Sequence, residues 1–257
     1  MPSKIEHFRQ LSERTAREIV SSPERWTAFL TTAGRLYKYP FHEQLLIFAQ
    51  RPEATACADY ELWNHRMGRY VRRGGRGIAL LDNTGDRLRL RYVFDVADTG
   101  TTPHSRTPWL WQLGEQHKES VTAMLEATYG AAGDNLAQIL SGVAQNLTDQ
   151  YWEDGNFDYI RALDNSPEVE YDEFTIGIYF KAAASVSVAY SLLSRCGLHP
   201  EERFKADDFK ALTFFQTPAA VMELGNAVST ISEGVLRQLE AVIRKYERER
   251  LDRKSVV

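Results

Sequence analysis

The strongest constraint on the fold is a change of hydrophobic period near the middle of the chain. Residues 78–82 form a short apolar run, residues 83–86 have the composition of a tight turn, and apolar and polar residues then alternate over 87–95. Alternation places successive side chains on opposite faces of a strand, so the pattern predicts a β-hairpin. One face of its second strand is expected to carry Leu88, Leu90, Tyr92 and Phe94, and the other face Arg87, Arg89 and Arg91.

Helical patterns flank the hairpin on both sides. Ser22 followed by Pro23 predicts a helix start, because serine caps a first turn and proline fits its first position. A second helix is predicted over residues 41–50, and Asp59 is expected to cap a short third helix that ends at Gly68. From residue 113 onward the periodicity predicts only helices, over 115–129, 135–152, 172–196, 206–215 and 217 to about 253.

These elements predict an α+β fold class and two domains. Residues 1–98 are expected to form an α+β domain that combines a small antiparallel hairpin or sheet with helices. Residues 99–112 lack periodicity and are predicted to be a linker or loop. Residues 113–257 are expected to form an all-helical region with an acidic segment and a long C-terminal amphipathic helix. Beyond Tyr246 that helix has almost no apolar face, which suggests one module of a larger protein.

The chain is predicted to be cytoplasmic, with no membrane partner. Its first ten residues are charged and contain no apolar run of the kind found in signal peptides. Residues 174–193 are apolar, but Lys181 would lie near the bilayer centre at a cost of about 2.5–3.5 kcal/mol. A buried core helix is the better interpretation. Cys57 and Cys196 are too few for a disulfide framework.

The formal net charge of −4 conceals two segments of opposite charge. Residues 34–92 contain eleven basic and six acidic residues, a net charge of +5. Residues 149–173 contain nine acidic residues and one arginine, a net charge of −8. A polyanion is expected to bind the first segment, because clustered charges select a partner of opposite sign. The acidic segment is a candidate surface for a protein partner.

Motifs for catalysis and for metal binding are missing from the sequence. His42 and Glu43 begin like a zinc-binding helix, but Leu46 stands where the second histidine is needed. The sequence contains no Gly-x-x-x-x-Gly-Lys-Ser/Thr phosphate loop and no Gly-x-Ser-x-Gly nucleophile turn. No cofactor and no metal are expected, and the chain is predicted not to be an enzyme. A metal-dependent nuclease remains an alternative.

The most informative segment is residues 63–78, in which five arginines fall within eleven positions together with Tyr70 and several glycines. Glycine lets backbone N–H groups approach a phosphate closely, and guanidinium groups bind phosphate through paired hydrogen bonds. Aromatic rings stack on unpaired bases. The segment therefore predicts an interface for single-stranded nucleic acid. The expected binding residues are Trp63, Arg66, Arg69, Tyr70, Arg72, Arg73, Gly74, Arg76, Gly77, Arg87, Arg89 and Arg91.

Each part of this interface also has a purely structural interpretation. Trp63 begins the apolar face of a short helix, which favours a place in the core over base stacking. Gly74, Gly75 and Gly77 can simply form the turn between helix and strand. The arginines of the second strand can be the solvent face of a half-buried hairpin. The proximity of all these features in the sequence favours nucleic-acid binding.

Several motifs resemble, in the same order, the ArdC-like N-terminal domain. They are residues 36–52 (LYKYPFHEQLLIFAQRP), 54–58 (ATACA) with Trp63, 68–74 (GRYVRRG), 77–80 (GIAL) and 91–95 (RYVFD). In antirestriction proteins this domain binds single-stranded DNA. It is also similar to the N-terminal region of large polyvalent proteins of bacterial conjugative elements and phages, in which helicase and DNA methylase modules follow. The resemblance covers about residues 20–98.

The resemblance implies that this chain is a non-catalytic single-stranded DNA-binding module of a mobile genetic element, with a role in antirestriction. It implies a strand-binding surface made of the Trp63 region with Arg69, Arg72, Arg73, Gly74, Arg76 and Gly77. ArdC-type proteins continue into a metallopeptidase-like domain with a His-Glu-x-x-His helix; this sequence has no such motif, so protease activity is not implied. The alternative is a protein-interaction or DNA-mimic module whose acidic helices act on a restriction or conjugation protein.

Overall fold

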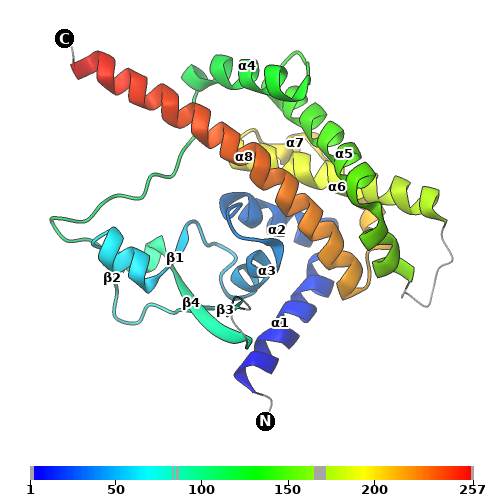
Figure 1. Cartoon of the computed structure of the whole chain (residues 1–257), viewed down its shortest axis with the longest axis horizontal. Coiled ribbons are helices and arrows are strands. Elements are labelled where there is room, and N and C mark those ends of the chain that lie inside the picture. The colour runs from blue at the N-terminus through cyan, green and yellow to red at the C-terminus, as the bar shows by residue number, and fades with distance from the viewer. Residues whose placement is uncertain (1–2, 83, 85–86, 165–171, 256–257) are drawn as a thin grey trace. The chain divides into compact units, whose positions relative to one another are not determined.

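The computed structural model describes residues 3–82, 84, 87–164 and 172–255. The chain divides into two compact units, Met1–Leu110 and Trp111–Val257 (Figure 1). The division falls within residues 99–112, the segment predicted to be a linker, although the first two residues of that segment form a strand. The N-terminal unit combines helices with a small antiparallel sheet and the C-terminal unit is helical, which confirms the predicted α+β class.

Three helices open the N-terminal unit: α1 (Lys4–Ile19), α2 (Pro23–Arg35) and α3 (Phe41–Gln50). The Oγ atom of Ser22 accepts a hydrogen bond from the backbone N–H of Arg25 at 3.3 Å, which confirms the predicted cap of α2. The bounds of α3 are those predicted. α1 was not predicted, although Phe8 and Leu11 lie on one helical face and pack against the core.

α3 packs on a three-stranded antiparallel sheet with the strand order β1-β4-β3. The strands are β1 (Cys57–Asp59), β3 (Ile78–Asp82) and β4 (Arg89–Asp95), and β3 with β4 confirms the predicted hairpin. β3 lies at the edge of the sheet. The amide of Gln50 in α3 covers that edge, because its Oε1 accepts the N–H of Ala79 and its Nε2 donates to the carbonyl of Ala79, both at 2.9 Å.

The register confirms that the arginines and the apolar residues of β4 lie on opposite faces, but at Arg91 the arginine face was expected to be exposed and is covered. Leu80 is opposite Arg91 in the register, so these two side chains share a face of the sheet. Leu80 and Val93 are buried in a cluster with residues of α3, which shows that the arginine face is the one that α3 covers. Tyr92 lies on the opposite face and is 46% exposed. Alternation predicts that a strand has two faces, whereas the packing partner decides which face is buried.

A two-stranded antiparallel ribbon completes the N-terminal unit. It pairs β2 (Tyr70–Val71) with β5 (Thr99–Gly100). Before β2, Leu62–Arg66 form the short π-helix η1, and the Oδ1 atom of Asp59 accepts the N–H of Leu62 at 2.7 Å, which confirms the predicted cap. The 3₁₀ turn η2 (Val96–Asp98) leads from β4 directly into β5. The same chain segment therefore connects the sheet to the ribbon.

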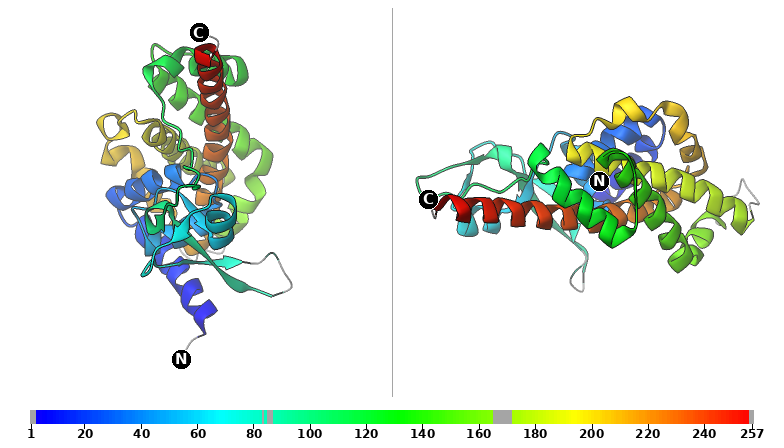
Figure 2. Two further views of the ribbon diagram at one scale, coloured as in Figure 1. Left: turned by 90° about the vertical axis from the view of Figure 1, so that its left-hand side faces the viewer. Right: turned by 90° about the horizontal axis from the view of Figure 1, so that it is seen from above.

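The described part of the C-terminal unit contains only helices. In chain order they are η3 (Glu115–His117), α4 (Lys118–Tyr129), α5 (Leu136–Asp164), α6 (Glu173–Cys196), α7 (Pro200–Arg203), η4 (Ala206–Phe214) and α8 (Pro218–Ser255). α5, α6 and α8 pack against one another, and Figure 2 shows α8 as one long ribbon in orange and red. Residues 248–253 of α8 are exposed.

α6 is, among the described helices, the one that is long and apolar enough to cross a membrane. Its apolar window is 67% buried inside the protein. Gly177 lies against the indole of Trp152 in α5, where a Cβ atom would come within 3.1 Å of the ring. Lys181 pairs with Asp149 of α5 at 3.2 Å. These contacts make α6 the central packing element of its unit.

Candidate nucleic-acid interface

The basic turn, residues 72–77, is a tight turn closed by glycine. The backbone N–H of Gly75 donates to the carbonyl of Arg72 at 2.9 Å, which makes residues 72–75 a β-turn. Gly74, the third residue of this turn, has φ +89°, a conformation that residues with a Cβ atom rarely adopt. Arg72, the first residue of the turn, and Arg73, the second, are both exposed.

The basic turn is held by residues 98–106, which we call the backing segment. The backbone N–H of Arg72 donates to the carbonyl of Asp98 at 2.8 Å, and the backbone N–H of Arg106 donates to the carbonyl of Met67 at 2.8 Å. Between these bonds, β5 pairs with β2. The segment that the sequence predicts to be a linker is thus the antiparallel partner of residues 67–72. It also brings the exposed Arg106 to the ribbon, a residue that the sequence analysis missed.

Four of the predicted arginines are exposed and unpaired. Within the described part of the chain, their side chains form no ion pair and no hydrogen bond. We call them the unpaired arginines: Arg66, Arg72, Arg73 and Arg76. Arg87, next to the tip of the hairpin, is exposed and likewise has no partner among the described residues. Exposed guanidinium groups without internal partners are available to an external anion.

Three other predicted arginines have partners within the protein, so their guanidinium groups are less available to a ligand than those of the unpaired arginines. Arg69 donates from Nε to the hydroxyl of Thr99 at 2.8 Å and fixes the ribbon. Arg91 donates from Nη2 to both carboxylate oxygens of the buried Glu43, at 2.6 and 2.7 Å. Arg89 pairs with Asp82 across the hairpin at 2.8 Å, and its side chain remains 69% exposed. These contacts satisfy each guanidinium group in part and give all three arginines a structural role.

The position of Trp63 also differs from the predicted interface. Its side chain is buried, and its Nε1 atom donates to the carbonyl of Phe94 at 2.8 Å. A buried indole cannot stack on a base, so Trp63 belongs to the core. Tyr70, by contrast, is 50% exposed. Its ring lies over Gly100, where a Cβ atom would overlap the ring, so that glycine is needed for the ring to take this position.

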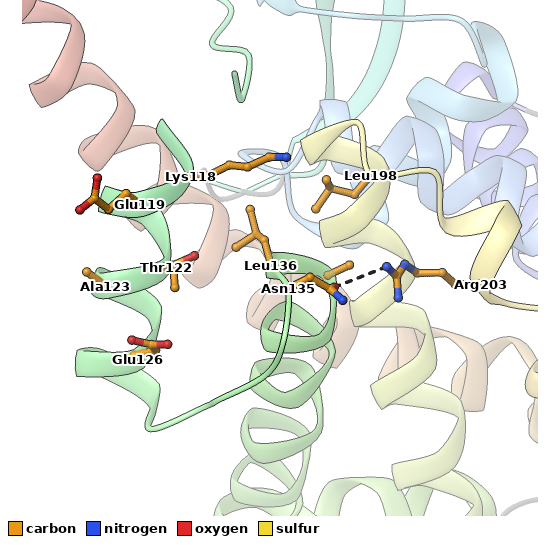
Figure 3. Close-up of a pocket in the computed structure, with 10 residues that line it drawn as sticks. Lys118, Glu119, Thr122, Ala123, Glu126, Asn135, Leu136, Leu198 and Arg203 are labelled. Atoms are coloured by element: carbon orange, nitrogen blue, oxygen red, sulfur yellow. Dashed lines mark hydrogen bonds between the residues drawn. The ribbon is translucent and has the colours of Figure 1, made fainter. Parts of the chain in front are cut away.

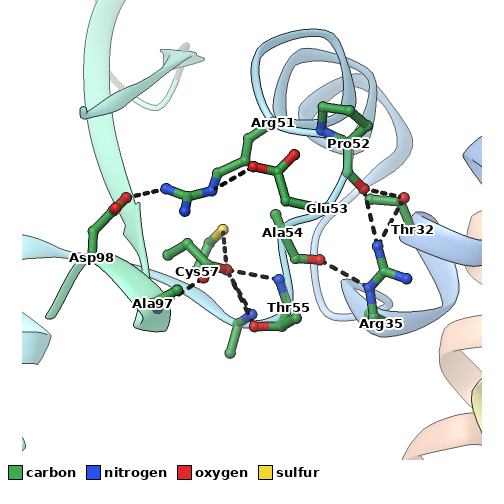
Figure 4. Close-up of polar contacts among 12 residues, drawn as sticks. Thr32, Arg35, Arg51, Pro52, Glu53, Ala54, Thr55, Cys57, Ala97 and Asp98 are labelled. Carbon is green, nitrogen blue, oxygen red and sulfur yellow. Dashed lines mark hydrogen bonds and ion pairs between the residues drawn. The ribbon is translucent and has the colours of Figure 1, made fainter. Parts of the chain in front are cut away.

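A polar cavity of about 530 Å³ adjoins the basic turn. Its lining residues are Gln50, Arg51, Glu53, Gly74, Arg76, Gly77, Ile78 and Asp98. Arg51 is already neutralised, because its guanidinium group pairs with the carboxylates of Asp98 and Glu53 (Figure 4). Arg76 is the one cation of this described lining that has no partner. The cavity therefore provides a polar surface next to the basic turn, on which the charges of two arginines and two carboxylates balance.

Asp95 organises the loop behind this cavity. Its buried carboxylate accepts the backbone N–H groups of Thr55 at 2.7 Å, Ala56 at 3.1 Å and Ala97 at 2.9 Å. Burial, together with the nearby charge of Asp95, raises the pKa of the Cys57 thiol to about 12. Figure 4 shows Cys57 beside these contacts. At neutral pH this thiol is protonated and is a poor nucleophile.

Groups of three or more histidine, cysteine, aspartate or glutamate side chains that could hold a metal ion are not found among the described residues. Glu43, which follows His42 in the incomplete zinc-like motif, is bound to Arg91. Cys196 is buried in α6, and burial raises its pKa to about 12.

The acidic segment lies partly outside the described residues. The side chains of Asp158 and Asp164, and the whole of Glu168 and Glu170, belong to the part that is not described. Within the described part, Asp149 pairs with Lys181. Asp172 caps α6 through the N–H of Thr175, and its hydrogen bonds with Thr175 lower the pKa of the Asp172 carboxyl. Both of these acids therefore have structural partners.

The C-terminal unit has a cavity of its own, of about 590 Å³, between α4, α5 and α7 (Figure 3). Its cations have partners: Lys118 pairs with Glu115 at 2.6 Å, and Arg203 donates to the side chain of Asn135 at 3.4 Å. Glu119 and Glu126 also line it. This balance of charge does not favour a phosphate ligand, unlike the surface of the basic turn.

Comparison with known proteins finds no relative for this chain. No protein-family model matches it, and neither a curated protein nor a solved structure matches it. The residues and their geometry therefore carry the functional inference.

Proposed function

We propose that the N-terminal unit binds single-stranded DNA as a non-catalytic module. The observation that carries this proposal is that the four unpaired arginines lie within eleven residues of the chain, and that three of them, Arg72, Arg73 and Arg76, belong to the turn that the backing segment holds. Charged side chains in proteins are usually solvated singly or paired, so a cluster of unpaired cations favours a polyanionic ligand. Backbone N–H groups at the glycine turn add donors that a phosphate can approach closely.

The choice of a single strand is supported by the exposed ring of Tyr70 beside β5. A base can stack on such a ring only if it is not already paired and stacked within a duplex. The resemblance of residues 20–98 to the ArdC-like domain supports the same choice. It also supports a role in a mobile genetic element, where the module would hold entering DNA and protect it from restriction.

A salt titration with a labelled single-stranded oligonucleotide tests this proposal. If the unpaired arginines contact four phosphates, log–log plots of affinity against salt should have a slope of about −2.8, which is about a 50-fold loss between 50 and 200 mM salt. Fluorescence anisotropy measures this loss. The variant R66Q/R72Q/R73Q/R76Q should bind at least about tenfold more weakly at 100 mM salt, with a slope close to zero.

The matched control removes the same charge elsewhere in the N-terminal unit. Arg9, Arg14, Arg17 and Arg25 are exposed on α1 and α2. The variant R9Q/R14Q/R17Q/R25Q has the same net charge as the first variant and should bind nearly as the wild type does. Equal losses in both variants would mean that net charge, not this surface, determines binding, and the proposed interface would be rejected.

A further inference from the structure

The three-stranded sheet has one face that α3 covers and one that remains partly open. The covered face carries Leu80 and Val93, both fully buried. On the opposite face Tyr92 is 46% exposed, and its cross-strand neighbour on β3 is the small residue Ala79. An aromatic ring with half of its surface in water presents a flat apolar surface to a ligand.

The ring of Tyr92 lies directly on the basic turn. A Cβ atom at Gly77 would be 3.2 Å from Cδ1 of Tyr92 and 3.3 Å from Cζ of Phe94, so the two rings pack against the glycine backbone. Gly77 follows Arg76, whose side chain is unpaired among the described residues. The ring of Tyr92 therefore packs on the residue that directly follows an unpaired arginine in the chain.

This juxtaposition matches the repeating unit of a single strand, in which each base is attached to a phosphate through one sugar. We propose that Tyr92 stacks on an unpaired base of the bound strand while Arg76 contacts an adjacent phosphate. The inference rests on the proposed function and names a residue within it. Tyr92 takes the role that the sequence analysis assigned to Trp63, which is buried.

A stacking role for Tyr92 also accounts for a preference for single strands over duplexes. Arginine contacts with phosphates are available on single strands and on duplexes alike. A stacking ring adds affinity only for a base that is free to leave its neighbours. Tyr92 is therefore expected to set the preference for single strands, whereas the unpaired arginines set the overall affinity.

The test compares Tyr92→Ile and Tyr92→Phe in the full chain. Isoleucine keeps the apolar packing on Gly77 and suits a strand, but it has no aromatic face. Tyr92→Ile should weaken binding to a labelled 12-nucleotide oligothymidylate about 5- to 150-fold and leave binding to a duplex of that length unchanged. Tyr92→Phe should bind within about twofold of wild type, because the ring is kept. The same strand built from abasic sites should bind wild type and Tyr92→Ile equally.

Phe174→Ile, a change at a ring that is 76% exposed on α6 of the other unit, is the matched control and should bind as wild type does. Circular dichroism of each variant checks that the sheet is intact. If Tyr92→Ile binds as wild type while R66Q/R72Q/R73Q/R76Q does not, the stacking role is overturned and the proposed function stands. If wild type binds no oligonucleotide, the proposed function fails and the stacking role fails with it.

Discussion

Arg91 in β4 holds both carboxylate oxygens of Glu43 in α3, at 2.6 and 2.7 Å, and so ties the sheet to the helix that covers it. The side chain of Glu43 is 9% exposed and that of Arg91 is 36% exposed. The pair lies where an alternating strand was expected to face water. The arginines of the N-terminal unit are thus of two kinds: those such as Arg91 that stabilise the fold through a partner, and the unpaired arginines, which remain available to a ligand.

Replacing Arg91 by alanine should destabilise the N-terminal unit. The buried carboxylate of Glu43 would lose its partner, and we expect the free energy of unfolding to fall by about 2–3 kcal/mol. Arg72→Ala, at an unpaired and exposed position, should change it by less than about 0.5 kcal/mol. Urea titrations followed by circular dichroism measure both values. Equal stability of the two variants would contradict the structural role of Arg91.

Trp63→Phe should affect stability and not DNA binding. The change removes the hydrogen bond to the carbonyl of Phe94 and part of a buried ring, at an expected cost of about 1–3 kcal/mol. Thermal unfolding measures the loss. Fluorescence anisotropy at a temperature where the variant is folded should give the same DNA affinity as wild type. A large loss of affinity under these conditions would show that Trp63 contributes to the interface.

Gly74→Ala should strain the basic turn without a steric clash. Nothing lies within 4 Å of a Cβ atom at this position, so the cost comes from its φ of +89° alone, about 1–2 kcal/mol. Gly74→Asn should cost less, because asparagine tolerates positive φ better than alanine does. Chemical denaturation of the two variants gives the order. If Gly74→Ala is as stable as wild type, the turn does not depend on this backbone conformation.

The pairing of Asp82 predicts a loss of stability in acid. Hydrogen bonds from Thr84 and Arg89 hold the pKa of Asp82 well below its usual range. A carboxyl whose pKa is lowered by folding contributes stability above its unfolded pKa of about 4 and loses it as the pH falls further. The free energy of unfolding should therefore decrease less steeply below pH 4 in Asp82→Asn than in wild type. Thr84→Ala should give an intermediate slope, and parallel slopes for all three proteins would refute the assignment.

Both cysteines should react slowly in the native protein. With the pKa of Cys57 and Cys196 raised to about 12, the thiolate fraction at pH 8 is on the order of a thousandfold below that of a free thiol. Reaction with a chromogenic disulfide reagent should become fast only in urea. Rapid modification of Cys57 in the native state would instead identify a reactive thiol.

Local signals in the sequence account for the elements that were predicted well. Ser22 and Asp59 cap their helices through contacts within three residues, and the hairpin follows from alternation around a turn. None of these features depends on distant parts of the chain. For the same reason the turn between helix and strand could be predicted from Gly74, Gly75 and Gly77 alone.

The remaining features depend on contacts that are distant in sequence. Whether Arg91 faces water or a helix depends on Glu43, which is 48 residues away in the chain. The backing segment has no periodicity, because only two of its residues, Thr99 and Gly100, form a strand. Its bond from Arg106 to Met67 can be known only once the chain is folded. A prediction from hydrophobic periodicity therefore assigned this segment to a linker and did not find β5, one of the two strands of the ribbon.

Gln50 has a consequence for how the sheet meets other molecules. An exposed edge strand offers unpaired backbone groups and can recruit a strand from another chain. At Ala79 both backbone groups are already occupied by one amide side chain, which acts there as a neighbouring strand would. The edge beside the basic turn is thereby closed to sheet extension at this position. A single side chain of α3 therefore limits the pairing of β3 with a strand of a second molecule.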